Sequence, residues 1–332
     1  MFPERNDYMD KLNILYTTDN NYFTHMLTSL YSLLKNNKDI YINIHIIETN
    51  LTKENYLLLD TIINNYNNCN LNIYNLKELQ YYIDLFDIPK WRNTDIGNAR
   101  LFASELINED KILYLDCDTI ITSSLKDLSK YYFNKPISAV KEFTIPIHLR
   151  NKLINYYNSG VIYFNYKSWN EEDCIRELYN TLSIEKNNLI YPDQDLLNLA
   201  LTERINTLDI SYNIFSYIYE INKYRFIRNK YFTKNPNYYK EEEITESLNN
   251  PHILHMLEYL YIRPWEQNKI HPFNDIYREY REIWDKDFKQ EKNNNILDQI
   301  KLLSYINILM KCLLSEETNN NIKSKVKRIL KP

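Results

Sequence analysis

The segment KILYLDCD, residues 111–118, joins a short apolar run to two aspartates. The apolar run predicts a buried strand, with Asp116 and Asp118 at its carboxyl end. Side chains two residues apart on a strand point the same way, so the two carboxylates would face one spot. Such a pair repels itself unless a cation lies between the charges, and hard oxygen ligands suit Mg²⁺ or Mn²⁺. The alternative interpretation is a solvated turn in which both aspartates cap a helix.

Strand and helix patterns alternate on both sides of this segment. Short apolar runs predict strands at 12–17, 41–47, 71–74, 137–141 and 161–165. Helical spacing predicts helices that begin near Tyr22, after Thr52, around 98–107 and after Asp193. This alternation predicts an α/β fold, in which a mostly parallel sheet is covered by helices on both faces.

Polar residues follow the first predicted strand. Asp19 and Asn21 lie at the same edge of the predicted sheet as Asp116 and Asp118, where open α/β sheets bind their ligands. Their side chains would offer hydrogen bonds to a nucleobase and a ribose. The same residue types are also frequent in plain turns, so that alternative stays open.

Three further clusters carry residue types suited to a site. Asn158-Ser159-Gly160 precedes an apolar strand pattern, and its glycine would permit either a close approach to a ligand or a tight turn. Asp193-Gln194-Asp195 opens a helix, where acids also serve the helix dipole. His255 is either a metal ligand or a structural histidine.

Composition excludes several classes of protein. The 332 residues carry a formal net charge of −4, which gives no sign of nucleic-acid binding. The chain has two glycines, Gly97 and Gly160, and so no glycine-rich phosphate loop. Its four cysteines form no CxxC pair, and no apolar run is long enough for a signal sequence or a membrane span. We therefore expect a cytoplasmic protein without a zinc site or a disulfide framework.

Taken together, these segments resemble glycosyltransferase family 8, the retaining galactosyl- and glucosyltransferases with a GT-A (Rossmann-like) fold. The resemblance runs in order from about Leu12 to Trp265. It includes residues 14–22, 99–101, 113–118, 157–161, 191–198, His255 and 263–265. It implies a mostly parallel mixed sheet flanked by helices.

The resemblance also implies a role for each matching residue. Asp116, Asp118 and His255 would hold Mn²⁺ (or Mg²⁺) against the diphosphate of a UDP-sugar donor. The remaining donor-binding residues would be Thr17, Thr18, Asp19, Asn21, Tyr22, Arg100, Cys117, Asn158, Ser159 and Arg263. Asp193 and Gln194 would line the sugar site and, with Arg100, take part in catalysis.

The chain departs from the family pattern after His255. Glu258 occupies a position where the family usually has glycine, and Arg263 replaces a lysine two residues later than usual. Arginine keeps the positive charge and binds phosphate with a different geometry. Asn98-Ala99 also replaces the aromatic or hydroxyl residues common before Arg100.

The expected organisation is a catalytic domain followed by a tail. Residues 1–284 would form the GT-A domain, with a nucleotide-sugar and metal half at about 11–120 and an acceptor half at about 130–284. Residues 285–332 would form a helical, basic C-terminal extension. Its last segment, 323–332, carries five positive charges and no acid, which suits either a solvated helix end or peripheral contact with the inner face of an anionic membrane.

The expected activity is transfer of a hexose, glucose or galactose, from a UDP-sugar to a saccharide or glycolipid acceptor such as a lipopolysaccharide or another surface glycan. Two alternatives stay open. One is a catalytically silent nucleotide-sugar-binding homologue, prompted by the altered residues after His255. The other is a self-glycosylating primer similar to glycogenin, which the 31 tyrosines would permit.

Overall fold

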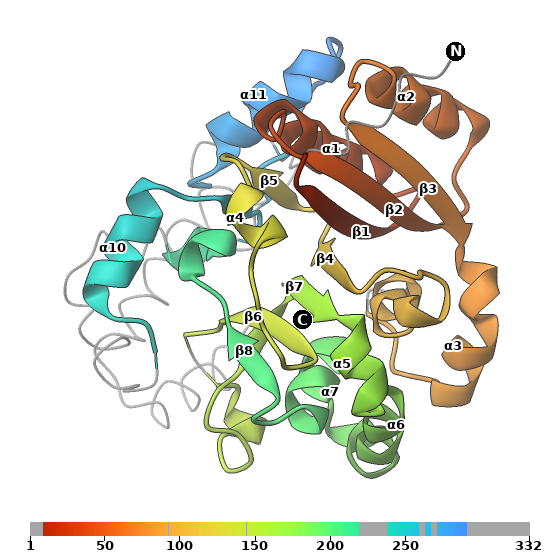
Figure 1. Ribbon diagram of the computed structural model, residues 1–332, viewed down its shortest axis with the longest axis vertical. Coiled ribbons are helices and arrows are strands. Elements are labelled where there is room, and N and C mark those ends of the chain that lie inside the picture. The colour runs from red at the N-terminus through yellow and green to blue at the C-terminus, as the bar shows by residue number, and fades with distance from the viewer. Residues whose placement is uncertain are drawn as a thin grey trace, which may run out of the picture.

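The computed structural model describes residues 9–91, 93–143, 145–218, 238–258, 263–266 and 271–290. Within these residues the chain builds a seven-stranded sheet and a smaller three-stranded sheet (Figure 1). The strands of the large sheet, in spatial order, are β3 (Cys69–Asn75), β2 (Tyr41–Thr49), β1 (Lys11–Asp19), β4 (Lys111–Leu115), β7 (Tyr157–Asn165), β6 (Ile137–Lys141) and β8 (Ile205–Thr207).

The large sheet is mixed and mostly parallel. Strands β1, β2, β3 and β4 run parallel, with Lys11 paired to Tyr41 at the start of the β1–β2 ladder. Strand β7 runs antiparallel to both β4 and β6, and β8 is again parallel to β6. This arrangement confirms the predicted α/β fold with a mostly parallel mixed sheet.

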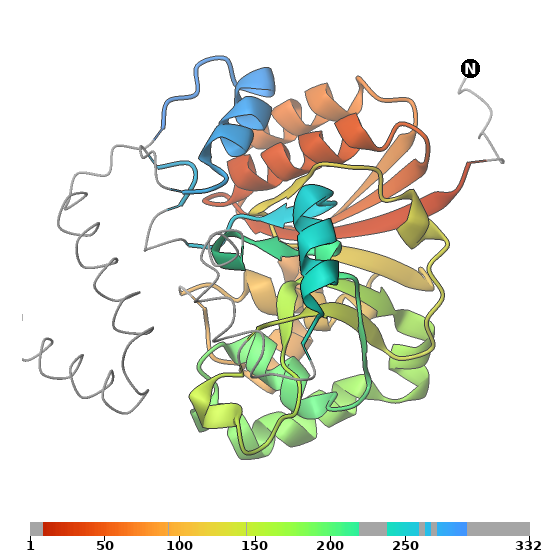
Figure 2. The same cartoon turned by 90° about the vertical axis from the view of Figure 1, so that its left-hand side faces the viewer.

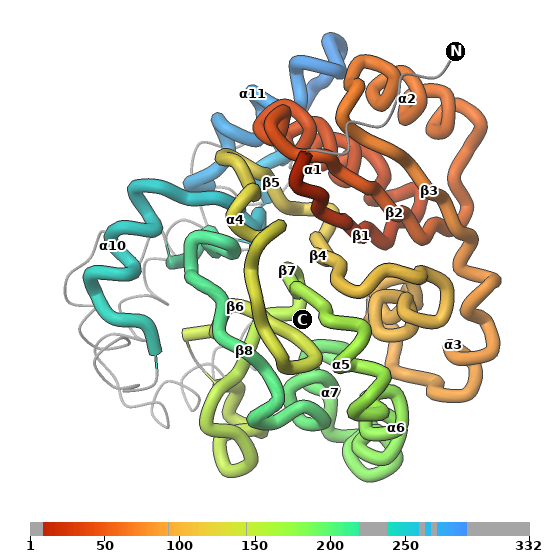
Figure 3. Tube along the Cα trace, viewed as in Figure 1, coloured from red at the N-terminus to blue at the C-terminus, as the bar shows by residue number. Residues whose placement is uncertain are grey.

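Helices cover both faces of the sheet. The α-helices are α1 (Phe23–Asn36), α2 (Lys53–Ile63), α3 (Gln80–Phe86), α4 (Lys126–Ser129), α5 (Tyr166–Glu171), α6 (Cys174–Glu185), α7 (Pro192–Ala200), α10 (Glu241–Asn249) and α11 (Asn274–Trp284). Helices α1, α2 and α11 lie on one side of the strands, and α5, α6 and α7 lie on the other (Figures 1 and 2). The tube in Figure 3 shows β4 joining the half that contains β1–β3 to the half that contains β6–β8.

Alternating side chains of β1 supply two separate cores. Leu12, Ile14 and Tyr16 face the core that contains α1. Leu15 faces the second core, which includes Phe102 and the helices α5, α6 and α7. These four side chains are each at most 1% exposed. The strand is therefore buried on both faces, as a continuous apolar run predicts.

The small sheet returns the C-terminal part of the chain to the end of β4. Its strands are β5 (Thr119–Ile121), β10 (Ile253–His255) and β9 (Ile214–Phe215). Strand β10 lies between the other two, antiparallel to β5 and parallel to β9. This pairing carries His255 to the turn that follows β4.

Most predicted elements are confirmed, and three details are wrong. Residues 98–107 form no α-helix but contain two short 3₁₀ helices, η2 (Ile96–Leu101) and η3 (Ala103–Glu105). Asn158-Ser159-Gly160 lies within β7, which begins at Tyr157, rather than before the strand. Asp116 and Asp118 lie in the turn after β4, and β5 follows directly, so they neither share a strand nor cap a helix.

Two predictions concern the tail and the membrane. Helix α11 ends at Trp284, and residues 291–332 of the predicted tail lie outside the described residues. None of the helices that the structure describes has both the length and the apolar character needed to cross a membrane.

Candidate active site

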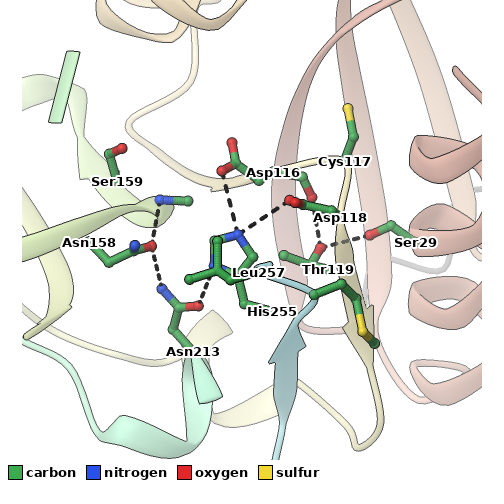
Figure 4. Close-up of polar contacts among 12 residues, drawn as sticks. Ser29, Asp116, Cys117, Asp118, Thr119, Asn158, Ser159, Asn213, His255 and Leu257 are labelled. Atoms are coloured by element: carbon green, nitrogen blue, oxygen red, sulfur yellow. Dashed lines mark hydrogen bonds and ion pairs between the residues drawn. The ribbon is translucent and has the colours of Figure 1, made fainter. Parts of the chain in front are cut away.

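Asp116 and Asp118 lie in the turn between β4 and β5, and His255 ends β10 opposite them. The antiparallel pairing of β10 with β5 sets Thr119 beside His255, and Met256 N donates to the Asp118 carbonyl at 2.7 Å. His255 Nε2 is held 3.2 Å from Asp118 Oδ1 and 3.7 Å from Asp116 Oδ2 (Figure 4). The two carboxylates converge as expected, but through a turn rather than through the alternation of one strand.

Each carboxylate has one oxygen held by an arginine and the other turned toward His255. Arg100 Nη1 donates to Asp116 Oδ1 at 2.9 Å, and Arg263 Nη1 donates to Asp118 Oδ2 at 2.5 Å. Burial acts to raise the pKa of the Asp118 carboxyl, but His255 and Arg263 outweigh burial and hold that pKa well below its usual range. Asp118 is therefore ionised, and each aspartate presents one oxygen on the side of the imidazole.

The imidazole of His255 turns Nε2 toward the two aspartates and Nδ1 toward Asn213. Asn213 Oδ1 lies 3.0 Å from His255 Nδ1, and because an amide oxygen only accepts, Nδ1 carries the proton. His255 Nε2 is buried without a hydrogen-bond partner among the described residues. One imidazole nitrogen and two carboxylate oxygens, all within 4.8 Å of one another, form a ligand set for a divalent cation. The three residues therefore fit the predicted cation.

Gly160 lies where a side chain would occupy the ligand site. A Cβ at this position would lie 2.2 Å from His255 Cε1 and 2.7 Å from Asp116 Oδ2. The Gly160 carbonyl also accepts from Asp116 N at 2.7 Å, which holds β7 against the turn. This glycine serves a close approach and not a tight turn. Gly97 is less constrained, since a Cβ there would meet Arg100 Nη2 at 3.5 Å.

A pocket of ≈ 630 Å³ opens above this turn, between the two halves of the large sheet. All fifteen residues predicted for the site contribute to its lining. They are Thr17, Thr18, Asp19, Asn21, Tyr22, Arg100, Asp116, Cys117, Asp118, Asn158, Ser159, Asp193, Gln194, His255 and Arg263. The structure thus brings residues from widely separated parts of the sequence to a single pocket.

Asp19 forms a turn and also lines the pocket. Its Oδ1 accepts from Asn21 N at 3.0 Å and from Tyr22 N at 2.9 Å, where β1 passes into α1. Both interpretations of the Asp19–Asn21 segment are therefore compatible with the structure. Cys117 is inert by comparison, since its Sγ donates to Thr17 O at 3.2 Å and burial raises the pKa of its thiol.

Arg100 connects the aspartate turn to α7. Its Nη2 lies 2.8 Å from Asp193 Oδ2, and its Nη1 donates to the Ser159 carbonyl at 2.8 Å in addition to Asp116. The guanidinium also lies over the Tyr114 ring, 4.5 Å from the ring centroid. Burial raises the pKa of Asp193, although the charge on Arg100 opposes that effect. Arg100 therefore fixes the position of Asp116 relative to Asp193.

The three polar residues Asp193, Gln194 and Asp195 at the start of α7 face different surroundings. Gln194 Oε1 accepts from Ser159 N at 2.9 Å at the pocket wall. Asp195 is fully buried, and its oxygens accept from Tyr156 Oη at 2.5 Å and from the backbone N–H of Tyr191 at 3.0 Å. It is not among the described residues that line the pocket. Asp193 and Gln194 are thus the members of this motif that face the pocket.

Two polar residues near the site, the half-buried Glu142 and the fully buried Asn213, escaped the sequence analysis. Glu142 lines the pocket, its Oε1 accepts from Asn158 Nδ2 at 2.9 Å and its Oε2 accepts from Tyr217 Oη, while burial raises its pKa. Glu142 directly follows the predicted strand 137–141, so the rule applied to the other strand ends would have found it. Asn213 carries no comparable signal in the sequence.

Aromatic rings were also missed. Trp91 and Tyr191 line the pocket with ring centroids 5.8 Å apart, and they are 47% and 45% exposed. Neither ring belongs to a segment with a regular apolar pattern. Their exposure beside the pocket leaves faces open that suit the apolar face of a sugar.

The residues that depart from the family pattern form an ion pair. Glu258 Oε1 lies 3.7 Å from Arg263 Nε, so the acid faces the arginine that replaces the usual lysine. The same guanidinium contacts Asp118 through Nη1. The unusual acid and the unusual base therefore compensate one another beside the candidate cation site.

Comparison with known proteins assigns this geometry to a family. The profile described as Glycosyl transferase family 8 matches residues 13–269. A lipopolysaccharide 1,2-glucosyltransferase of Escherichia coli is 27% identical over 329 residues, which cover 91% of this chain and 90% of that protein.

Two solved structures share the fold. Galactosyltransferase LgtC, determined with donor and acceptor sugar analogs, aligns with a TM-score of 0.65 and 17% identity over 87% of this chain and 99% of that chain. The bifunctional glycosyltransferase WbbM aligns with a TM-score of 0.65 and 19% identity over 82% of this chain and half (50%) of that chain. At these identities the likeness shows the GT-A fold alone.

Proposed function

This chain belongs to glycosyltransferase family 8, and on that premise we propose that it is a retaining hexosyltransferase. It moves glucose or galactose from a UDP-sugar to a hydroxyl group of a saccharide or glycolipid acceptor. The convergence of Asp116, Asp118 and His255 at the base of one pocket carries this proposal. The Escherichia coli relative described above is named a lipopolysaccharide 1,2-glucosyltransferase, which supports a surface glycan as the acceptor.

The cation proposed for this site is Mn²⁺, with Mg²⁺ as the alternative. Carboxylate oxygens suit both ions, whereas an imidazole nitrogen is a softer ligand than Mg²⁺ usually takes. When bound, the cation would neutralise charge on the diphosphate leaving group. Arg100 and Arg263 already hold the outer oxygens of Asp116 and Asp118, so both carboxylates are oriented before a ligand arrives.

The uridine and the diphosphate would be bound by residues from different parts of the pocket. Asp19 and Asn21 at the end of β1 would bind the uridine, beside Thr17, Thr18 and Tyr22. Arg263 carries a positive charge next to Asp118 and would contact the departing diphosphate. Preorganised cations of this kind stabilise the charge that develops on a leaving group.

Asp193 and Gln194 are the residues proposed to lie nearest the reacting sugar. Gln194 is fixed by Ser159, and Asp193 by Arg100. The ion pair with Arg100 would hold Asp193 in position to stabilise an oxocarbenium ion. Front-face attack by the acceptor hydroxyl and a double displacement through one of these side chains are distinguished by trapping a glycosyl-enzyme, which only the second route forms.

The acceptor would enter between Trp91, Tyr191 and Glu142. The two exposed rings offer stacking surfaces, and Glu142 offers a carboxylate held by Asn158. Rings beside a polar anchor are a common way to hold a sugar, whose faces are apolar and whose rim is polar. Positioning the acceptor hydroxyl near the anomeric carbon is the main catalytic task on this side.

UDP release from a panel of UDP-sugars, with and without Mn²⁺, tests the proposal. We expect metal-dependent release from one sugar and a loss of at least about 100-fold in the Asp118→Asn variant, because the variant removes an anionic ligand. Binding of UDP without release from any sugar would instead support the silent homologue. An increase in intact protein mass after incubation with UDP-glucose would support the self-glycosylating primer.

A second proposal concerns the tail, which lies outside the described residues. We propose that the basic segment 323–332 attaches the enzyme to an anionic membrane surface, where a lipid-linked acceptor resides. Five positive charges, each contributing roughly 1 kcal/mol near such a surface, would suffice for reversible attachment. Cosedimentation with anionic liposomes, before and after removal of the residues beyond Asn319, tests this; unchanged binding would contradict it.

A further inference from the structure

A chain of three hydrogen bonds, of which the first two are buried, leads away from His255 on the side opposite the aspartates. His255 Nδ1 lies 3.0 Å from Asn213 Oδ1. Asn213 Nδ2 donates to Asn158 Oδ1 at 3.0 Å, and Asn158 Nδ2 donates to Glu142 Oε1 at 2.9 Å. The first two bonds are drawn in Figure 4. The chain thus joins the candidate cation site to the acceptor side of the pocket through two side-chain amides.

A backbone group fixes the direction of every bond in this chain. Gly160 N donates to Asn158 Oδ1 at 2.9 Å, and a peptide N–H can only donate. The oxygen of the Asn158 amide must therefore face Gly160, which turns its nitrogen to Glu142. That oxygen also receives Asn213 Nδ2, so the oxygen of Asn213 must face His255.

The direction of these bonds decides that Nδ1 of the His255 imidazole carries a proton. An oxygen that only accepts requires a proton on His255 Nδ1, so in the neutral imidazole that binds a metal Nε2 carries the lone pair. Nε2 is the atom that lies between Asp116 Oδ2 and Asp118 Oδ1. A flipped Asn213 amide would present N–H groups to Nδ1 and would move the proton to Nε2, where it would block a cation.

We propose that Asn213 is a positioning residue that fixes the Nδ1-protonated form of His255 and so prepares Nε2 to bind the divalent cation. This inference rests on the proposed function, because it assigns the cation to the same site. Asn213 is fully buried and is not among the described residues that line the pocket. It contacts the candidate cation site through His255, which it reaches from a different part of the chain. Groups that hold the second nitrogen of a metal-binding histidine in this way typically alter metal affinity by about 10- to 100-fold.

Manganese binding to the full chain, measured by titration of the EPR signal of free Mn²⁺, tests this role without any sugar substrate. We expect Asn213→Leu to weaken Mn²⁺ binding by at least about tenfold. We expect Asn213→Asp to lose less affinity than Asn213→Leu, because a carboxylate oxygen still accepts from Nδ1, although it no longer donates to Asn158 Oδ1. Asn213→Ser should again bind weakly, since a hydroxyl both donates and accepts and so fixes neither form of the imidazole.

Asn37→Leu is the matched control. Asn37 is also fully buried and uses both ends of its amide, with Nδ2 donating to Leu33 O at 2.9 Å and Oδ1 accepting from Leu125 N at 2.6 Å. Its replacement should lower the free energy of unfolding and leave the Kd for Mn²⁺ unchanged. A weakened affinity in Asn213→Leu alone would therefore report on His255 and not on general loss of stability.

Wild-type Mn²⁺ affinity in folded Asn213→Leu would overturn the inference, and so would equal losses in Asn213→Leu and Asn37→Leu. If Asn213→Leu does not fold, wild-type affinity in Asn213→Ser would overturn it instead. The outcomes also separate this inference from the proposed function. A wild-type chain that binds Mn²⁺ but transfers no sugar contradicts the transferase and leaves the role of Asn213 standing. A chain that releases UDP but binds no Mn²⁺ contradicts the role of Asn213 and leaves the transferase standing.

Discussion

At the scale of single residues, the two glycines of this chain differ in what surrounds them. Gly160→Ala would place a Cβ 2.2 Å from His255 Cε1 and 2.7 Å from Asp116 Oδ2, so the candidate ligands must move apart. We expect Mn²⁺ affinity and UDP release to fall by at least about tenfold, with a loss of roughly 1–3 kcal/mol in the free energy of unfolding from overpacking. Gly97→Ala is the control, since its Cβ meets its nearest neighbour at 3.5 Å. Equal activities of the two variants would contradict this account of Gly160.

Arg100 is a second residue whose geometry, more than its charge, is expected to matter. Its nitrogens reach Asp116, Asp193 and the Ser159 carbonyl at 2.8–2.9 Å. The single ammonium of a lysine cannot span these groups, so Arg100→Lys would leave Asp193 buried without its cation. We expect kcat for UDP release to fall about 100-fold, with a smaller change in KM, because both carboxylates lose their relative position.

Arg204→Lys provides the comparison for Arg100→Lys. Arg204 Nη1 pairs with Glu172 at 3.4 Å, and both side chains are about a third exposed, at 30% and 35%. Exposed ion pairs contribute little to stability, so this variant should retain its activity and its free energy of unfolding within measurement error. A comparable loss of kcat in both variants would show that the loss does not depend on the contacts of the Arg100 guanidinium at the site.

At the scale of elements, His25 joins α1 to α11 and to the segment behind Arg263. Its ring lies 3.9 Å from the Trp265 ring, centroid to centroid, and its Nδ1 lies 2.7 Å from Tyr277 Oη. Burial, assisted by the charge of Arg281, lowers the pKa of His25 from 6.5 to about 3. The unfolded chain therefore binds a proton near pH 6.5, whereas the folded chain binds it only near pH 3.

This difference predicts a loss of stability in acid. Between those two pKa values protonation favours the unfolded state, so the free energy of unfolding falls as the pH falls, by roughly 1.4 kcal/mol per pH unit from this group. Urea unfolding from about pH 7 to about pH 5 measures the slope. His25→Gln should reduce the slope by the share of this group, since burial also lowers the pKa values of His45 and His271, whereas Tyr277→Phe should lower stability at each pH and leave the slope. An unchanged slope in His25→Gln would show that His25 does not cause it.

The elements also show which features the sequence could predict. Strands buried on both faces, such as β1 and β4, appear as continuous apolar runs, and the residues after each run were placed at one edge of the sheet. The same spacing misled at 98–107, because apolar residues three or four apart suit 3₁₀ turns as well as an α-helix. Packing of Ala99 and Phe102 in the core and of Arg100 at the site decides between the two, and these are tertiary contacts.

Asn213 is a residue of the site whose role could not be predicted from the sequence. Its partners are His255 and Asn158, which lie 42 and 55 residues away in the sequence. A lone asparagine outside a strand pattern is usually a turn residue, so nothing local indicates that its amide orients an imidazole. The candidate ligands could be predicted because they share a chemical type, whereas the residue that orients His255 depends on how β7, β9 and β10 meet.

At the scale of the whole molecule, the pocket is lined from both halves of the large sheet, the half with β1–β3 and the half with β6–β8, whereas the two hydrophobic cores lie on opposite faces of that sheet. Thr17 and Asp19 line it from β1, on the first half, and Asn158 and Asp193 line it from β7 and α7, on the second. Arg100 and His255 connect the two sides at its base. A nucleotide and cation that bind there contact both halves at once, so they should stabilise the folded chain as a unit.

We therefore expect UDP and Mn²⁺ together to raise the thermal unfolding temperature by several degrees. A ligand at about 100 times its Kd stabilises the folded state by roughly 2.7 kcal/mol, because it binds the folded chain and not the unfolded one. Asp116, Asp118 and His255 would hold the cation, whose charge would attract the diphosphate, so UDP or Mn²⁺ alone should give a smaller shift than the pair. In Asp118→Asn the shift from the pair should fall to that of UDP alone. Scanning calorimetry of the four ligand conditions measures these shifts. If UDP alone shifted the unfolding temperature of the wild type as much as UDP and Mn²⁺ together, nucleotide binding would not depend on the cation, and the proposed role of these three residues would be contradicted.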